Sequence, residues 1–414
     1  MKVCVVGGGA AGCMAAIMLA RRGVDVTLLE KNEKIGKKLY ITGKGRCNLT
    51  NNCDMDDMFA HVVHGEKYLK SALYSFTPRD TMDFFENAGV PLVTERGNRV
   101  FPASQKSSDI IKALSAELKL SGVHVKLNSE VKHISAKEGG FEVAVKDSFS
   151  VTDKLYQSDK VVVATGGVSY PSTGSTGDGY LFAKSFGHNI VEPKQALVAM
   201  RVREDVSSLQ GIALKNVNLS ALTKDGKAVC ERFGELMFTD RGLSGPVALT
   251  LSSYINRLDG VKLVLDLKPS LDEKQLDARI LRDFEERKNQ DIKNVTRALL
   301  PDRLNVYVLR RADIPEYKKV NAVTKDERAR LVRTVKNLTF DMTGLAPFTE
   351  AVITSGGVAL KGLTPSGESR MQAGLYFIGE TVDVDALTGG FNLQIAFATA
   401  VACARDIVKK TSKE

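Results

Sequence analysis

The segment Gly7–Gly12, with the sequence GGGAAG, has the residue types and spacing of a turn that binds phosphate. Gly7 permits a tight turn, Gly9 lets the backbone approach a pyrophosphate, and Gly12 lets a helix pack close to its strand. Glu30 follows about 20 residues later, where a carboxylate accepts hydrogen bonds from both hydroxyls of an adenosine ribose. Because a carboxylate repels a 2′-phosphate, the pattern predicts FAD or NAD rather than NADP.

The residues around this turn predict the elements that position it. Val3–Val6 is a short apolar run with β-branched residues, Cys13–Ala20 is rich in Ala, Met and Leu, and Val24–Leu29 reads as a second strand. Strand, glycine turn, helix, strand and acid together form the expected dinucleotide-binding unit. The N-terminus of the helix carries roughly +0.5 charge and unpaired N–H groups, which suit a phosphate.

Three further segments could lie along the same ligand. Residues 31–51 are dense in Gly, Lys and Asn and show no periodicity, so we expect an ordered loop that runs from the ribose toward the reactive ring. A solvated basic loop is the alternative. The apolar run 160–164 leads into Thr-Gly-Gly at 165–167, where small residues allow the backbone to contact a cofactor. Two glycines at 389–390 precede a final apolar helix over 393–408.

The composition is that of a soluble globular protein, with 43% hydrophobic and 26% charged residues, and 414 residues suffice for two or three domains. The net charge of +9 comes without a long basic run, so we expect no nucleic-acid partner. We expect a small-molecule substrate, and the positive charge favours an anionic one. Six cysteines without a CxxC pair predict a cytoplasmic protein with no disulfide or metal site. No segment approaches about 18 uninterrupted apolar residues, so no membrane span is expected. The oligomeric state stays open.

Changes in periodicity along the chain indicate an insertion. Amphipathic helices are predicted over 68–89 and 108–121, and an antiparallel meander is predicted at residues 123–127, 130–134 and 141–145. After Pro193, short strands separated by turns predict a small β-barrel, followed by a charged helical subdomain at 271–338. We therefore predict two parts of one cofactor domain with an inserted substrate domain between them, at residues 1–192, 193–344 and 345–414.

Along nearly its whole length the sequence resembles the bacterial FAD-dependent oxidoreductases with an inserted barrel and helical domain, which are related to the glutathione-reductase type. Several long motifs in a fixed order carry the resemblance: GGGAAG at 7–12, GKKLYITGKGRCNLTN at 36–51, ATGGVSYPSTGSTGDGY at 164–180, GELMFTDRGLSGP at 234–246, TSGGV at 354–358 and GLYFIGETVDVDALTGGFNLQIAFA at 374–398. The resemblance implies an α/β fold with a discontinuous FAD/NAD(P)-binding Rossmann domain and an inserted β-barrel and helical subdomain.

The resemblance also implies where FAD would bind. The adenosine would lie on the first glycine turn and Glu30, and the ribityl chain and flavin would lie near the C-terminal glycines up to Gln394. The predicted cofactor-binding residues are Gly7, Gly9, Ala10, Ala11, Gly12, Glu30, Lys31, Lys38, Gly43, Arg46, Cys47, Asn48, Thr165, Gly166, Gly167, Gly379, Glu380, Asp383, Gly389, Gly390, Phe391, Asn392 and Leu393.

Two residues are predicted to act in catalysis. A reduced flavin gathers negative charge, which the N-terminus of the final helix at Asn392 can stabilise. Tyr170, beside a glycine loop, is the candidate proton donor, with packing as the alternative. Cys47 could approach the flavin or simply pack. The sequence contains one dinucleotide fingerprint, so either NAD(P)H docks transiently as electron donor or oxygen is the acceptor.

These observations leave three hypotheses. The first is an NAD(P)H-dependent flavoenzyme that reduces a conjugated C=C bond in a 3-oxo steroid or bile-acid-like enone, by hydride transfer from reduced flavin. The second is an oxygen-dependent flavin oxidase of small amino ketones such as aminoacetone. Both follow activities that the family resemblance implies. The third is an RNA-associated flavoprotein, suggested only by the net charge of +9.

Overall fold

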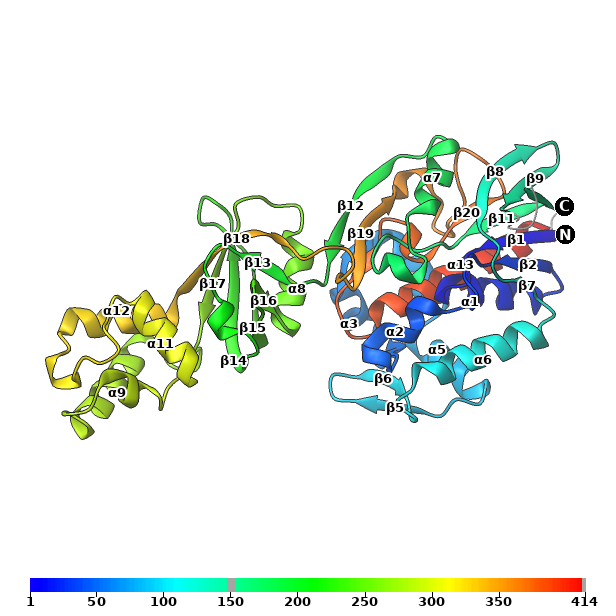
Figure 1. The fold of residues 1–414 in the computed structure, drawn as a ribbon. Helices are drawn as coiled ribbons and strands as arrows, with labels where there is room; N and C mark the ends of the chain where they lie inside the picture. The colour runs from blue at the N-terminus through cyan, green and yellow to red at the C-terminus, as the bar shows by residue number, and fades with distance from the viewer. Residues whose placement is uncertain (147–152, 412–414) are drawn as a thin grey trace. The chain divides into compact units, whose positions relative to one another are not determined.

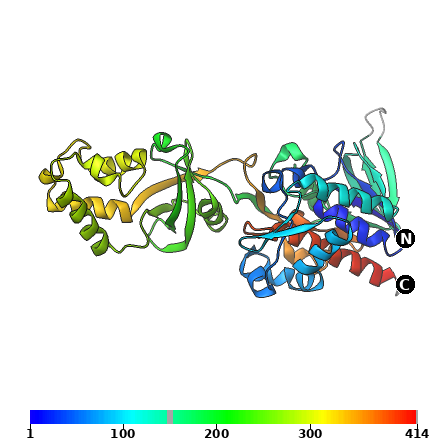
Figure 2. The same ribbon diagram turned by 90° about the horizontal axis from the view of Figure 1, so that it is seen from below.

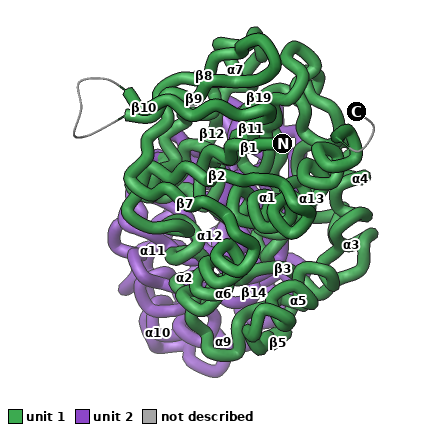
Figure 3. Tube along the Cα trace, turned by 90° about the vertical axis from the view of Figure 1, so that its right-hand side faces the viewer, with its two compact units in different colours: residues 1–195, 348–414 green, residues 196–347 purple. Residues whose placement is uncertain are grey.

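The computed structural model describes residues 1–146 and 153–411, and the chain divides into two compact units. Unit 1 contains residues 1–195 and 348–414, and unit 2 contains residues 196–347 (Figure 1, Figure 3). The sequence analysis places these boundaries after residues 192 and 344. Unit 1 is thus built from both ends of the chain, and unit 2 is an insertion.

A five-stranded parallel sheet forms the centre of unit 1. Its central strands are runs of buried apolar residues, as expected for a sheet that is covered on both faces. In spatial order the strands are β20 (Leu375–Phe377), β11 (Lys160–Val163), β1 (Lys2–Val6), β2 (Asp25–Leu29) and β7 (His124–Lys126). Helix α1 (Ala10–Ala20) connects β1 to β2, which confirms the unit predicted for the start of the chain.

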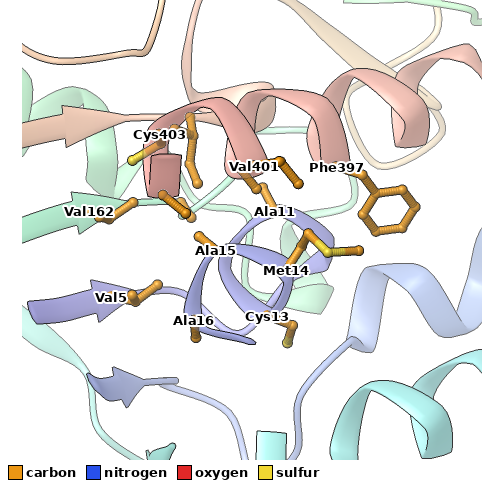
Figure 4. Close-up of a cluster of buried hydrophobic side chains, with 14 of the residues drawn as sticks. Val5, Ala11, Cys13, Met14, Ala15, Ala16, Val162, Phe397, Val401 and Cys403 are labelled. Carbon is orange, nitrogen blue, oxygen red and sulfur yellow. The ribbon is translucent and has the colours of Figure 1, made fainter. Parts of the chain in front are cut away.

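Helix α13 (Phe391–Thr411) packs along α1 in the core of unit 1. Figure 4 shows Phe397 and Val401 of α13 on the side that faces the short side chains of α1, among them Ala11. By length and composition α13 could also cross a membrane, but 67% of its apolar window is buried, as in the core helix of a soluble protein. At its end, the Thr411 hydroxyl lies 3.0 Å from the Met1 sulfur, so α13 ends beside the start of β1 (Figure 2).

The predictions for residues 68–89 and 31–51 differ from the structure in detail. The stretch 68–89 forms two helices, α4 (Glu66–Ser75) and α5 (Pro78–Asn87), because Thr77 and Asp80 form a capping box and the proline cannot continue a helix. The segment 31–51, predicted as a loop, contains helix α2 (Lys37–Gly45), which begins after Gly36 in the left-handed region and is kinked at residues 42–44.

The predicted meander is also wrong in its first strand. Residues 124–126 form β7, which pairs in parallel with β2 at the edge of the main sheet. Local alternation of polar and apolar residues does not distinguish a parallel edge strand from a hairpin strand. The meander instead consists of β8 (Val131–Lys137), β9 (Gly140–Val145) and β10 (Lys154–Ser158).

The other elements of unit 1 surround the main sheet and connect its strands. They are β3 (Thr50–Asn51), α3 (Met55–Ala60), β4 (Val62–His64), β5 (Leu92–Glu95), β6 (Arg99–Pro102), α6 (Ser107–Leu120), α7 (Asp178–Ser185), β12 (Ile190–Ala196), β19 (Ile353–Val358) and β21 (Asp385–Ala386).

Unit 2 is a closed barrel with helices, which confirms the predicted barrel and helical region. Around the barrel the strands are β13 (Met200–Val202), β16 (Gly242–Ser244), β15 (Ala228–Phe238), β14 (Ala213–Leu222), β17 (Lys262–Asp266) and β18 (Leu338–Leu345). The helices are α8 (Pro246–Ile255), α9 (Glu273–Glu286), α10 (Ile292–Thr296), α11 (Asp302–Arg311) and α12 (Lys325–Lys336). Buried Leu, Ile, Val and Phe side chains give this unit a core of its own.

One buried amide ties α13 to three other segments of unit 1. Gln394 is fully buried, and its Oε1 accepts hydrogen bonds from the hydroxyls of Thr50 and Thr81, each at 2.7 Å. Its Nε2 donates to the Phe76 carbonyl at 2.8 Å. Since these partners belong to β3, α5 and the end of α4, the amide fixes the first turn of α13.

Replacing Gln394 with Leu removes all three hydrogen bonds and leaves the buried partner groups unpaired. An unpaired buried polar group costs about 1–3 kcal/mol, so we expect the free energy of unfolding to fall by about 4 kcal/mol. Urea denaturation followed by circular dichroism measures this change, with Leu393→Met in the same helical turn as the control. A loss no larger than that of the control would contradict the role assigned to the amide.

Candidate functional site

In the first glycine turn, Gly7 and Gly12 lie too close to neighbouring backbone atoms to carry a side chain. Gly7 has φ +106°, and a Cβ on Gly12 would lie 1.8 Å from the Gly7 carbonyl oxygen. A Cβ on Gly9, in contrast, would meet nothing within 4 Å. Gly9 is the N-cap of α1 and provides no side-chain cap, so N–H groups of the first helical turn face open space. The structure therefore leaves room for a phosphate at this helix N-terminus.

Glu30 lies at the end of β2 with 8% of its surface exposed. Its Oε2 accepts a hydrogen bond from the Gly8 N–H at 2.6 Å, and its Oε1 accepts from the backbone and side-chain nitrogens of Asn32 at 2.8 and 2.6 Å. These contacts hold the carboxylate beside the glycine turn, where the sequence predicts the adenosine ribose.

A half-buried ion pair joins predicted cofactor segments that lie far apart in the sequence. The Lys38 ammonium lies 2.6 Å from Oε2 of Glu380 and donates to the Ser169 hydroxyl at 2.6 Å. Oε1 of Glu380 accepts from the same hydroxyl at 2.9 Å and from the Thr354 N–H at 2.8 Å. In a similar way the Lys31 ammonium pairs with Asp178 at 2.7 Å. These charges position backbone segments that would surround a cofactor.

Further glycines line the same region and leave no space for side chains. A Cβ on Gly167 would lie 2.4 Å from the Thr354 hydroxyl oxygen, and one on Gly379 would lie 2.8 Å from Cβ of Ala11. A Cβ on Gly390, which has φ +99°, would lie 2.3 Å from the Thr50 carbonyl oxygen. The chain thus comes close together at the positions that the sequence assigns to the flavin nucleotide.

Several polar atoms in these segments are buried without a partner among the described residues. Oδ1 of Asn48, Oδ1 of Asn51 and Oγ1 of Thr165 make no hydrogen bond there. Two of these residues were predicted to bind the cofactor, and an unpaired buried polar group is costly. The open glycine turn and these polar atoms fit a dinucleotide, which the predicted cofactor residues would hold.

A cavity of about 580 Å³ lies in unit 1 beside the start of α13. It is lined by Gly43, Lys44, Arg46, Asn48, Asn51, Asp57, His61, Gly97, Asn98, Arg99, Phe101, Thr388, Gly389 and Phe391. The lining contains three cationic groups and one carboxylate, together with three asparagines. Its potential therefore favours an anionic or strongly polar ligand.

The cationic groups of this cavity are held in different ways. Arg46 pairs with Glu95, and its guanidinium carbon lies 4.1 Å from the centre of the Phe101 ring. Lys44 lies in the left-handed region with φ +58°, between two glycines that also have positive φ. A non-glycine residue in this region is strained, and such strain is often found at functional sites. The kink in α2 thus presents Lys44 at the cavity.

Neither of the two residues predicted to act in catalysis lines the cavity. Tyr170 is not among the residues that line the cavity; it has φ +50°, and its N–H donates to the Phe348 carbonyl at 2.9 Å. Asn392 uses both ends of its amide on the backbone of Ala386, with Nδ2 donating to the carbonyl at 2.7 Å and Oδ1 accepting from the N–H at 2.9 Å. Their catalytic roles stay predictions.

Some of the other predicted residues line the cavity, and those of the first glycine turn do not. The lining residues among them are Gly43, Arg46, Asn48, Gly389 and Phe391. Cys47 is fully buried, and burial raises the pKa of its thiol to about 12, so it is a neutral thiol near neutral pH. This protonation state suits packing better than a redox role.

The sequence analysis did not identify His61, Asp57, Arg99 and Phe101 as site residues. His61 and Asp57 belong to α3 and its C-cap, whereas Arg99 and Phe101 belong to β6. Neither segment contains a motif or spacing that indicates chemistry, and the basic loop around Arg46 was the one available signal. Only the packing of these segments around the glycines brings the residues together.

The glycine turn, the buried acid and the close glycine contacts define a Rossmann-type protein that binds a dinucleotide. The chain belongs to the HI0933-like protein Rossmann domain family, whose model matches residues 1–406. This confirms the family that the sequence resembles and identifies the protein as an FAD-dependent oxidoreductase.

Three relatives match over almost the whole chain. The ribosomal RNA dihydrouridine synthase of Haemophilus influenzae is 31% identical, with 98% of each chain covered. The protein of the same name from Escherichia coli is 30% identical and covers 99% of this chain and 98% of its own. The 3-dehydro-bile acid delta(4,6)-reductase of Clostridium scindens is 28% identical, with 98% of each chain covered.

The two glycines of the first turn give a matched pair of variants. Gly9→Ala adds a methyl group that meets no protein atom, so we expect the free energy of unfolding to change by less than about 1 kcal/mol. The same methyl group occupies the approach to the pyrophosphate, so we expect the dissociation constant of FAD to rise about tenfold or more, equivalent to about 1.4 kcal/mol. Fluorescence titration of the apoprotein with FAD measures this rise.

Gly12→Ala is the control, because its Cβ would collide with the Gly7 carbonyl oxygen. We expect this variant to lose about 3 kcal/mol of stability, as overpacked sites do, in urea denaturation. If Gly9→Ala bound FAD as tightly as the unmodified protein, the turn would not be the pyrophosphate site.

Proposed function

We propose that this protein reduces a C=C bond that is conjugated to a carbonyl group, and that its substrate is a uracil ring in ribosomal RNA. FAD, when bound and reduced by a nicotinamide nucleotide, supplies the hydride. Uracil has a C5=C6 bond conjugated to its C4 carbonyl, so its reduction has the same chemistry as that of an enone. The protein's own residues must bind the substrate, orient it and provide a proton.

The cationic cavity in unit 1 is the observation that carries this proposal. Lys44, Arg46 and Arg99 line it, and this charge suits the phosphates that flank a nucleotide. Arg46 lies over the Phe101 ring, and unpaired bases stack on aromatic rings and on guanidinium groups. The two ribosomal RNA dihydrouridine synthases that match the whole chain support the same substrate.

This proposal departs from the expectation of no nucleic-acid partner, which was based on the lack of a long basic run. The excess charge is unevenly distributed, since residues 271–338 contain 17 Lys and Arg against 12 Asp and Glu. A basic surface made from spaced residues on several helices attracts phosphates as a continuous run does. A reductase of ribosomal RNA would act in the cytoplasm, where we expect the protein.

A second candidate is the reduction of a 3-oxo steroid or bile-acid-like enone, the first hypothesis from the sequence. The bile-acid reductase of Clostridium scindens matches 98% of this chain and supports it. Such a substrate needs a predominantly apolar lining, however, and in this cavity Phe101 and Phe391 stand beside Lys44, Arg46 and Arg99. The charge of the cavity therefore favours the nucleotide.

The two candidates are separated by the oxidative half-reaction. The bound FAD is reduced with NADPH or NADH under anaerobic conditions, and its reoxidation is followed after adding unmodified ribosomal RNA or a 3-oxo-Δ4 steroid. In a separate sample aminoacetone is added to the oxidised flavin. We expect RNA to reoxidise the flavin and to contain dihydrouridine by mass spectrometry of its nucleosides. Reoxidation by the steroid alone would select the second candidate. Reduction of the oxidised flavin by aminoacetone alone would indicate an amine oxidase.

Lys44→Gln and Arg99→Gln remove one positive charge each from the cavity. Because each loses about one phosphate contact, we expect KM for RNA to rise about tenfold and the slope of log KM against log salt concentration to fall by about one. Steady-state kinetics at several salt concentrations measure both, and Lys184→Gln on α7, an exposed lysine outside the cavity, is the control. Equal kinetics for all three variants would contradict the assignment of the cavity.

A further inference from the structure

We propose that His61 is the general acid of this site and delivers a proton to the α-carbon of the substrate from its Nε2 atom. This inference rests on the proposed reduction of a conjugated C=C bond. It assigns a catalytic role to a residue that belongs to none of the motifs on which the family resemblance is based.

The orientation of the His61 ring is fixed by two contacts. The ring stacks on Phe391, with 4.2 Å between ring centres and 12° between the planes. Its Nδ1 lies 2.7 Å from the backbone carbonyl oxygen of Asp57. Since a carbonyl oxygen can only accept a hydrogen bond, Nδ1 carries a hydrogen and acts as the donor. Nε2 is therefore the ring nitrogen that gains and loses a proton.

The surroundings of His61 suit a group that must be positively charged before it reacts. Oδ1 of Asp57 lies 3.4 Å from Nδ1, within ion-pair distance of a protonated ring. Lys44, Arg46 and Arg99 line the same cavity. The His61 side chain is 33% exposed, so water can reach the ring and return a proton after each turnover.

Backbone contacts place His61 relative to the glycines at the start of α13. The Leu387 N–H donates to the His61 carbonyl at 2.9 Å, and β4, which follows His61, pairs with β21. Gly389 and Phe391 come directly after this segment and line the cavity together with His61. The imidazole thus lies at the end of the site where the sequence places the reactive ring of the cofactor.

The reaction balances with this assignment. A hydride adds to the β-carbon, and the C=C electron pair moves to the α-carbon as the carbonyl accepts the developing charge. The α-carbon then takes the proton from Nε2 of His61, which leaves a neutral imidazole and a saturated product. Water returns the proton to Nε2, and the nicotinamide nucleotide named above is the reductant.

The other candidates for this role are less well placed. Tyr170 does not line the cavity. His64 is paired through Nδ1 with the buried carboxylate of Asp385 at 2.5 Å and is not a lining residue either. Among the residues that line the cavity, His61 is the one imidazole, the side-chain type that most often serves as a general acid.

His61→Asn tests the inference in single-turnover experiments on the FAD-loaded protein. We expect the rate of flavin reoxidation by the RNA substrate to fall about 100-fold or more, as for the loss of a general acid. Three other quantities should stay within about twofold of their values in the unmodified protein. They are the FAD content, the rate of flavin reduction by the nicotinamide nucleotide and the dissociation constant of RNA. His124→Asn is the matched control, because His124 is 63% exposed on β7, and all its rates should be unchanged.

A second measurement uses binding instead of turnover. In ¹⁵N-labelled, FAD-loaded protein, uridine monophosphate is expected to shift the Nε2 resonance of His61, assigned with the variant, and to leave that of His124 in place. The inference would be overturned if the rate of flavin reoxidation were unchanged in His61→Asn. It would also be overturned if the variant lost FAD or RNA binding while the reoxidation rate of the bound complex stayed the same. Failure of the unmodified protein to reduce any conjugated substrate would overturn the proposed function itself.

Discussion

The fold of unit 1 depends on backbone segments that lie so close together that no side chain fits between them. The carbonyl of Gly7 lies against Gly12 of α1, Ala164 at the end of β11 lies against Gly7, and Gly379 lies against Ala11. Each contact would be broken by a single added methyl group. Because α1 then lies directly above its strands, its N-terminus and the ends of the parallel strands converge at one place, where a phosphate can bind.

Buried and half-buried polar contacts then hold the two ends of the chain together in one domain. Glu380 accepts hydrogen bonds from Lys38, Ser169 and the Thr354 backbone, and Gln394 joins α13 to β3, α4 and α5. Such networks are costly when they are incomplete, so they specify one arrangement of the segments. The insertion of unit 2 between residues 195 and 348 is compatible with this because unit 2 has a core of its own.

The chemistry of the site follows from the same convergence. The kinked α2, the C-cap of α3 and β6 each bring polar or cationic groups to the glycines that precede α13. The cavity therefore combines positive charge with a histidine whose ring is held by Phe391. The reduction that we propose needs charge to bind an anionic substrate and a proton to complete the reaction, and the cavity has groups for both.

The sequence by itself determined the family and the fold class, and it predicted where the nucleotide binds. Glycine spacing, the acid at position 30 and the change from helical to strand periodicity are local signals, and the corresponding elements agree with the structure. The tertiary structure decided the rest. Residues 124–126, which were predicted in a meander, belong to the parallel sheet. Tertiary packing also brings His61, Arg99 and Phe101 to one cavity. No local pattern encodes these contacts, because they join segments whose separation in space is set by packing.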